Sequence, residues 1–178
     1  MNIIRLSIML LFMSDYFSWD VELDDGSREE VEMGENGMVS DGSLYTETLG
    51  CCIGIAVYDP EEDIGYFSHL DTVSRDRQDY MSQYNQFMGM IPDGLGDPEV
   101  LLAGGADPDP KDEIDPDFND GATRSMYHVK GLKATTERIL NQNFDGVEVD
   151  RPGSSDTELY LSSDEGIQVY HRDQVQNE

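Results

Sequence analysis

The sequence predicts an α/β (α+β) fold in which helices cover a β-sheet structure. Three observations support this fold class. Apolar runs rich in β-branched and aromatic residues occur in both halves of the chain, two stretches of helical periodicity lie between them, and no internal repeat is visible. The length of 178 residues suits a single domain with a sizeable core.

The first residues differ in character from the rest of the chain. Residues 1–28 show no periodic pattern, so we expect a poorly ordered N-terminal extension there, a domain from 29 to 173 and a tail from 174 to 178. The opening MNIIRLSIMLLFM resembles the apolar part of a signal peptide, but it lacks a small-residue cleavage site and is shorter than the about 20 residues that span a bilayer. We rank three interpretations of this segment. The first is an upstream extension before a true start at Met13, the second is a secretion signal, and the third is a membrane anchor.

The first half of the domain is expected to form strands followed by a helix. Residues 29–33, EEVEM, alternate weakly as a strand. CIGIAVY (52–58) and IGYFSHL (64–70) are apolar strands, and the turn DPEED between them predicts a hairpin. Apolar residues then recur at helical spacing over 79–91 and stop at Pro92, which predicts a helix.

The second half is expected to return to strands after one more helix. EVLLAGG (99–105) predicts a buried strand ending in two glycines, and the acidic residues 106–122 with three Asp-Pro steps predict an exposed loop. A second helix is predicted over 125–141. The final strands are GVEVD (146–150), TELYLS (157–162) and GIQVYH (166–171), the last two joined by a turn at SDEG.

The charge of the chain limits its partners. With 38 acidic against 11 basic residues the net charge is −27, which repels nucleic acid backbones and anionic membranes. We therefore expect no nucleic acid partner and no membrane insertion. The spread of acidic residues suggests a halophilic acidic protein of a salt-rich cytoplasm, where molar salt shortens the Debye length to about 3 Å; an acidic protein of ordinary cytosol is the alternative.

The two cysteines, Cys51 and Cys52, are adjacent, which suits neither a disulfide nor a metal site. A reducing, cytoplasmic location is the simpler interpretation. The segment DPDFNDGATRSM begins like a calcium loop, but Gly121 comes one place late and Met126 stands where the bidentate glutamate is required. We therefore expect no metal and no cofactor.

Cys52 and His69 form the candidate reactive pair. In the predicted hairpin, the start of the first strand lies beside the end of the second, so the thiol and the imidazole meet at one sheet edge. Cys51 is expected on the opposite face, because side chains alternate along a strand. A thiol beside a histidine gains a lowered pKa and nucleophilic reactivity, so Cys52 is expected to react faster than Cys51; the alternative is a buried strand cysteine near a satisfied histidine.

A set of residues surrounds this pair at specific spacings: Gly34 and Glu35, Thr46, Leu49, Gly50 and Cys52, Tyr58, Asp59 and Pro60, and His69. Their pattern resembles the CheD family of chemoreceptor glutamine deamidases. The likeness covers roughly residues 29–171, and it extends to AGGA at 103–106, where the family has a G-G-A step, and to the following helix and final hairpin. The chain departs from the family pattern at Thr48, Cys51, SHLDTVS and DRPGSSDTE, where a glutamine-bearing partner would dock.

The resemblance implies a fold and a function. The fold would be the three-layer sheet-and-helix sandwich of CheD and of the catalytic domain of cytotoxic necrotizing factors. Cys52 would attack a glutamine side-chain amide, His69 would accept the thiol proton and pass it to ammonia, and Thr46 would orient the imidazole. The chain would then be a hydrolase of chemotaxis, a protein-glutamine deamidase acting on methyl-accepting chemoreceptors, with a CheC-type phosphatase as a further partner. The alternatives are deamidation of another protein, or a non-catalytic CheD-like adaptor that binds a receptor or phosphatase.

The acidic composition leads to a first prediction. We expect the melting temperature to rise with potassium chloride concentration, because screening relieves the self-repulsion of a chain with net charge −27. Thermal melts from low to molar salt measure this. A melting temperature that stays flat or falls contradicts the salt-adapted interpretation and favours the acidic protein of ordinary cytosol.

Overall fold

The computed structural model describes residues 21–22, 28–47, 49–72, 77–105, 121–150 and 157–171. Within them the chain forms a mixed α/β fold with two helices and two mixed sheets. The predicted N-terminal extension up to residue 20, most of the acidic loop 106–122, and the tail 174–178 lie outside the described residues.

The larger sheet has six strands in the order β1-β3-β6-β5-β7-β8. Strand β5 is central, and it pairs antiparallel with both β6 and β7. Strands β1 and β8 extend the two edges in parallel with β3 and β7. The strands are β1 (Val21–Glu22), β3 (Asn36–Val39), β5 (Ile53–Asp59), β6 (Ile64–Leu70), β7 (Glu99–Gly104) and β8 (Glu148–Val149).

The smaller sheet has four strands in the order β10-β9-β4-β2. Strands β9 and β10 form an antiparallel hairpin, β4 pairs antiparallel with β9, and β2 runs parallel to β4. Alternate residues of β4 and β9 are buried, so one face of this sheet packs inward. The strands are β2 (Arg28–Glu30), β4 (Ser43–Thr46), β9 (Thr157–Ser162) and β10 (Gly166–His171).

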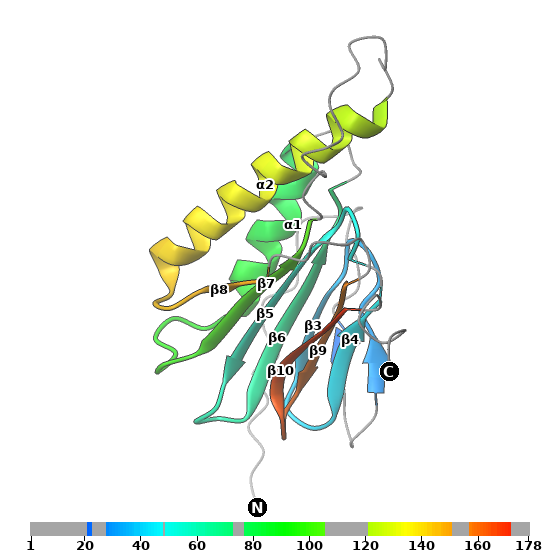
Figure 1. The fold of residues 1–178 in the computed structure, drawn as a ribbon. Coiled ribbons are helices and arrows are strands. Elements are labelled where there is room, and N and C mark those ends of the chain that lie inside the picture. The colour runs from blue at the N-terminus through cyan, green and yellow to red at the C-terminus, as the bar shows by residue number, and fades with distance from the viewer. Residues whose placement is uncertain are drawn as a thin grey trace, which may run out of the picture.

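The helices α1 (Arg77–Met90) and α2 (Gly121–Asn143) lie together on one face of the six-stranded sheet, and the four-stranded sheet covers the other face (Figure 1). Two apolar clusters fill the interfaces. Ile53, Ile55 and Val57 of β5 pack toward the helices, whereas Cys52, Ala56 and Tyr58 pack toward the smaller sheet. Because β5 is buried on both faces, its whole sequence is apolar except for its last residue, as is usual for a central strand.

Most predicted elements are confirmed. The hairpin is observed as β5 and β6, the first helix as α1, and the glycine-ended strand as β7; the second helix is longer than predicted at both ends. The predicted strand at 29–33 overlaps β2, and the last three predicted strands match β8, β9 and β10. The sequence analysis missed β3 and β4, whose sequences NGMV and SLYT are short and partly polar. Strand pairing also begins at Val21, ahead of the predicted boundary at 29.

The helices of the described residues do not have the character of membrane spans. Neither has the length and apolar composition that crossing a bilayer requires.

The interface between the two sheets leads to a second prediction. Leu161 of β9 is fully buried, and a Cβ added at Gly65 of β6 would lie 2.6 Å from its side chain. Leu161→Ala should lower the free energy of unfolding by about 2–5 kcal/mol, because it opens a cavity. Gly65→Ala alone should cost about 1–3 kcal/mol, because it overpacks the same spot.

The double variant provides the control. In the Leu161→Ala background the methyl group introduced by Gly65→Ala occupies the vacated space, so the double variant should be more stable than the sum of the two costs predicts. Urea unfolding of the four proteins gives this coupling. Strictly additive costs would show that Gly65 and Leu161 do not share the packing seen between the sheets.

Candidate active site

The predicted site residues meet at one end of the two sheets. Thr46 ends β4, Cys52 directly precedes β5, and His69 lies one residue before the end of β6. The antiparallel register places Gly54 opposite His69 and Ile53 opposite Gly104, the last residue of β7. The end of β7 therefore joins the three predicted residues at this edge.

His69 is tethered through one of its ring nitrogens. Its Nδ1 lies 2.7 Å from Thr46 Oγ1 and 3.4 Å from the carbonyl oxygen of Val31. A carbonyl oxygen only accepts hydrogen bonds, so the Val31 contact requires the proton of the neutral ring to sit on Nδ1. The lone pair of the imidazole then lies on Nε2.

The other ring nitrogen is poised to accept a proton. His69 is 6% exposed, and within the described residues its Nε2 has no hydrogen-bond partner. Burial lowers the pKa of His69, which keeps the ring neutral and its lone pair available at neutral pH. A buried polar atom without a partner costs about 1–3 kcal/mol, so this nitrogen suits a partner that arrives with a substrate.

A tight turn fixes the backbone of His69. The N–H of Gly34 donates to the His69 carbonyl at 2.7 Å, and the His69 N–H donates to the Glu35 carbonyl at 3.0 Å. Gly34 has φ of 90°, a conformation that glycine adopts without strain. Gly34 and Glu35 were expected to matter only because of the family resemblance, and in the structure their backbones hydrogen-bond to His69 of β6.

Cys52 lies diagonally across from His69 rather than directly opposite. Gly54 is the strand partner of His69, and Cys52 belongs to the same inward face two residues earlier. Diagonal neighbours have Cβ atoms up to about 7–8 Å apart, farther than a direct pair. Within the described residues no hydrogen bond joins the Cys52 thiol to the imidazole, and the two residues share the sheet edge with an offset of two residues in register.

The thiol of Cys52 is instead covered by Met33. Cys52 Sγ lies 3.5 Å from Met33 Sδ, and the Met33 side chain is 53% exposed while Cys52 is 5% exposed. The adjacent Cys51 is exposed, which confirms that the two cysteines face different environments. Met33 could not be predicted as a neighbour of the thiol, because nothing in the local sequence pattern links it to a residue of a distant segment.

The expected lowered pKa of Cys52 is wrong for this arrangement. Burial, followed by the neighbouring Cys51, raises the pKa of the Cys52 thiol to about 12, although the Thr72 backbone N–H acts in the opposite direction. The pair is therefore a neutral thiol and a neutral imidazole at rest. Iodoacetamide should consequently label the exposed Cys51 before Cys52, the reverse of the order expected from sequence.

The loop that carries Cys52 is held on several sides. The hydroxyl of Thr72 donates to the Cys51 carbonyl at 2.5 Å, and the Gly105 N–H donates to the carbonyls of Cys52 at 2.8 Å and Leu49 at 3.3 Å. The Leu49 N–H donates to the Thr157 carbonyl at 2.8 Å. Thr72 was not predicted as a site residue, because its contact depends on how β6 leaves the sheet.

Two other features of the described residues do not add to this site. No group of three or more His, Cys, Asp or Glu side chains is placed there to hold a metal ion. A cavity of about 480 Å³ lies between the end of α1, residues 91–98 and Phe144. It adjoins the first residues of β7, whereas the Cys52 loop contacts the last ones, so it lies at the other end of that strand.

A scan against protein-family models gives no match for this chain, and a search of curated proteins gives none either. The chemistry of the site therefore rests on its own geometry.

The cover over the thiol leads to a third prediction. Met33→Ala should increase the alkylation rate of Cys52 several-fold while leaving that of Cys51 unchanged, because it removes the group that shields Sγ. The Cys52 rate should also rise with pH toward about 12, since only the thiolate reacts. Peptide mapping after brief exposure to iodoacetamide measures both cysteines.

Met33→Leu is the matched control, because leucine keeps an apolar cover of similar size. Equal Cys52 labelling in wild type, Met33→Leu and Met33→Ala would show that Met33 does not shield the thiol in solution.

Proposed function

We propose that this protein is a protein-glutamine deamidase that hydrolyses a glutamine side chain to glutamate and ammonia. The observation that carries the proposal is the tethered His69. Its Nδ1 is held by Thr46, and its buried Nε2 has no partner among the described residues. Cys52 lies at the same edge of the sheet. A thiol, a neutral imidazole and an orienting hydroxyl are the groups that amide hydrolysis through a thioester requires.

The resting protonation states favour general-base catalysis. A glutamine side chain that displaces Met33 would bring its amide carbon to Cys52 Sγ. As sulfur attacks this carbon, Nε2 of His69 accepts the thiol proton, and the carbonyl oxygen becomes a tetrahedral oxyanion. The imidazolium then donates that proton to the departing nitrogen, ammonia leaves, and a thioester remains.

Hydrolysis of the thioester repeats the sequence with water. His69 accepts a proton from the attacking water. The second tetrahedral intermediate then collapses to release glutamate, and the imidazolium returns its proton to the departing sulfur, which regenerates the Cys52 thiol and the neutral ring. Thr46 acts as a positioning residue throughout, since its hydroxyl bonds to Nδ1 rather than to the nitrogen that transfers the proton. Backbone N–H groups near Cys52 are the candidates for stabilising the oxyanions, as expected from the resemblance.

The layer order supports a fold of the CheD and cytotoxic necrotizing factor type. Helices, a six-stranded sheet and a four-stranded sheet follow one another, and the reactive pair lies where the two sheets meet. Within that family the substrate would be a glutamine of a methyl-accepting chemoreceptor in the cytoplasm, with a CheC-type phosphatase as a regulator. The same chemistry on another protein is the first alternative.

One observation favours the non-catalytic alternative. The Cys52 thiol is covered by Met33, and its pKa is raised to about 12, which would suit an adaptor that keeps the fold without turnover. An adaptor would still bind a receptor or phosphatase. Turnover therefore separates the two functions, and binding does not.

A fourth prediction tests the proposal. Incubated with a chemoreceptor cytoplasmic fragment, the wild-type protein should convert glutamine to glutamate, seen as a mass gain by intact-mass analysis. Cys52→Ala should abolish turnover and His69→Ala should lower kcat by about 10²–10⁴, because the general base is lost. Thr46→Val should lower kcat less, and Thr46→Ser should retain most of it because the hydroxyl remains.

Binding measured in parallel completes this test. Cys52→Ala should still bind the fragment. Binding by wild type with no mass gain, even in the presence of molar salt, would refute the deamidase proposal and leave the adaptor.

A further inference from the structure

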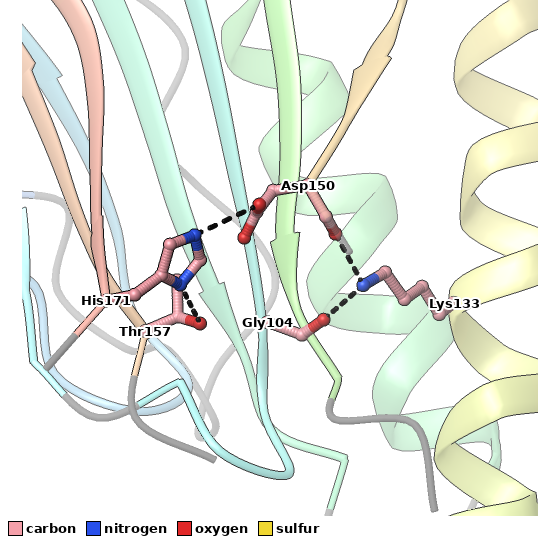
Figure 2. A network of polar contacts seen from close by, with 5 residues as sticks. All are labelled: Gly104, Lys133, Asp150, Thr157 and His171. Atoms are coloured by element: carbon pink, nitrogen blue, oxygen red, sulfur yellow. Dashed lines mark hydrogen bonds and ion pairs between the residues drawn. The ribbon is translucent and has the colours of Figure 1, made fainter. Parts of the chain in front are cut away.

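A polar network joins Gly104, Lys133, Asp150, Thr157 and His171 (Figure 2). Lys133 of α2 donates from Nζ to the carbonyl of Gly104 and to the carbonyl of Asp150, the latter at 2.8 Å. The Asp150 backbone N–H bonds to Leu102 of β7 at 2.9 Å, and its carboxylate lies 3.3 Å from His171 Nε2. Lys133 thus connects α2 to the end of β7 and to the residue that follows β8.

The peptide group between Gly104 and Gly105 links Lys133 to the backbone of Cys52. Its carbonyl accepts from Lys133, and its N–H, at the opposite end of the same planar group, donates to the Cys52 carbonyl at 2.8 Å. A charged donor on the carbonyl polarises the peptide, which strengthens the hydrogen bond from its N–H. One peptide group therefore separates the ammonium of Lys133 from the backbone of Cys52.

This peptide needs an anchor. Both glycines have positive φ, 75° for Gly104 and 63° for Gly105, and glycine has the broadest range of backbone conformations. A Cβ at Gly104 would lie 2.4 Å from the Cys52 carbonyl oxygen, so the close approach excludes other residues there. Without Lys133, rotation of this peptide would direct its carbonyl toward the Cys52 carbonyl and break the hydrogen bond that holds the loop.

We propose that Lys133 is a positioning residue that holds the Gly104–Gly105 peptide in one orientation and thereby fixes the position of Cys52 relative to His69. This inference rests on the proposed deamidase function for its effect on turnover, but its effect on the Cys52 loop is independent of any substrate. Small displacements of reacting groups, of about 1 Å, lower rates by about 10²-fold. The loss of Lys133 should therefore appear in kcat more than in KM.

The experiment compares four substitutions in the full chain. Lys133→Met keeps an aliphatic stem against Gly105, where the Lys133 Cδ lies 3.1 Å from an added Cβ, but it removes the donor. Lys133→Arg keeps a charged donor, and Lys133→Gln keeps a neutral one. Lys130→Met is the matched control, because Lys130 is an exposed lysine of the same helix.

Two measurements are made on each variant. The first is the iodoacetamide labelling rate of Cys52 relative to Cys51, and the second is kcat and KM for deamidation of the chemoreceptor fragment. Lys133→Met should label Cys52 at least about threefold faster and lose at least about tenfold in kcat at nearly constant KM. Lys133→Arg should restore both values, and Lys130→Met should match wild type.

The outcomes separate this inference from the proposed function. Faster Cys52 labelling in Lys133→Met, with no turnover by wild type, supports the positioning role of Lys133 and refutes the proposed deamidase function. If wild type turns over and Lys133→Met matches Lys130→Met in both labelling and kcat, the positioning role of Lys133 is overturned and the deamidase proposal stands. If Lys133→Met does not fold, Lys133→Leu, which also lacks a donor, takes its place in the same comparison, and wild-type values in that variant also overturn the inference.

Discussion

The pairing of the central strand β5 with β6 on one side and β7 on the other determines the rest of the site. Its register sets Gly54 against His69 and Ile53 against Gly104. Because side chains alternate along a strand, this register also decides that Cys52 faces the smaller sheet, the layer from which Thr46 approaches. A shift by one residue would turn Cys52 toward the helices and away from Thr46.

The local features of the site can be predicted from the sequence, whereas the contacts between distant segments cannot. The β5–β6 hairpin has a short turn and two apolar runs, so its existence and the shared edge of Cys52 and His69 follow from pattern. Strand β4 was missed because SLYT is short and only half of it is buried. The lowered pKa expected for Cys52 was wrong because burial of the thiol, which depends on how distant segments pack, is the largest influence on its pKa and raises it.

The resting state of the site is closed and uncharged. A covered thiol with raised pKa is a poor nucleophile and a poor target for oxidation, and a neutral imidazole is available as a base. If the proposed deamidation takes place here, charge separates only when a substrate amide is present to receive the sulfur. Within the described residues Nε2 has no partner, and this small stability cost would then accompany a nucleophile that is activated in the transition state rather than beforehand.

The site also depends on how well the layers of the fold pack. Thr46 belongs to the four-stranded sheet and His69 to the six-stranded sheet, so their 2.7 Å contact crosses the apolar interface that holds the sheets together. Lys133 comes from the helix layer and contacts the end of β7. Groups from all three layers therefore converge within a few residues of Cys52. In a chain with net charge −27, self-repulsion acts against the compact packing of these layers. Because the site is built from all three layers, a small separation of the layers changes its geometry before the fold as a whole unfolds.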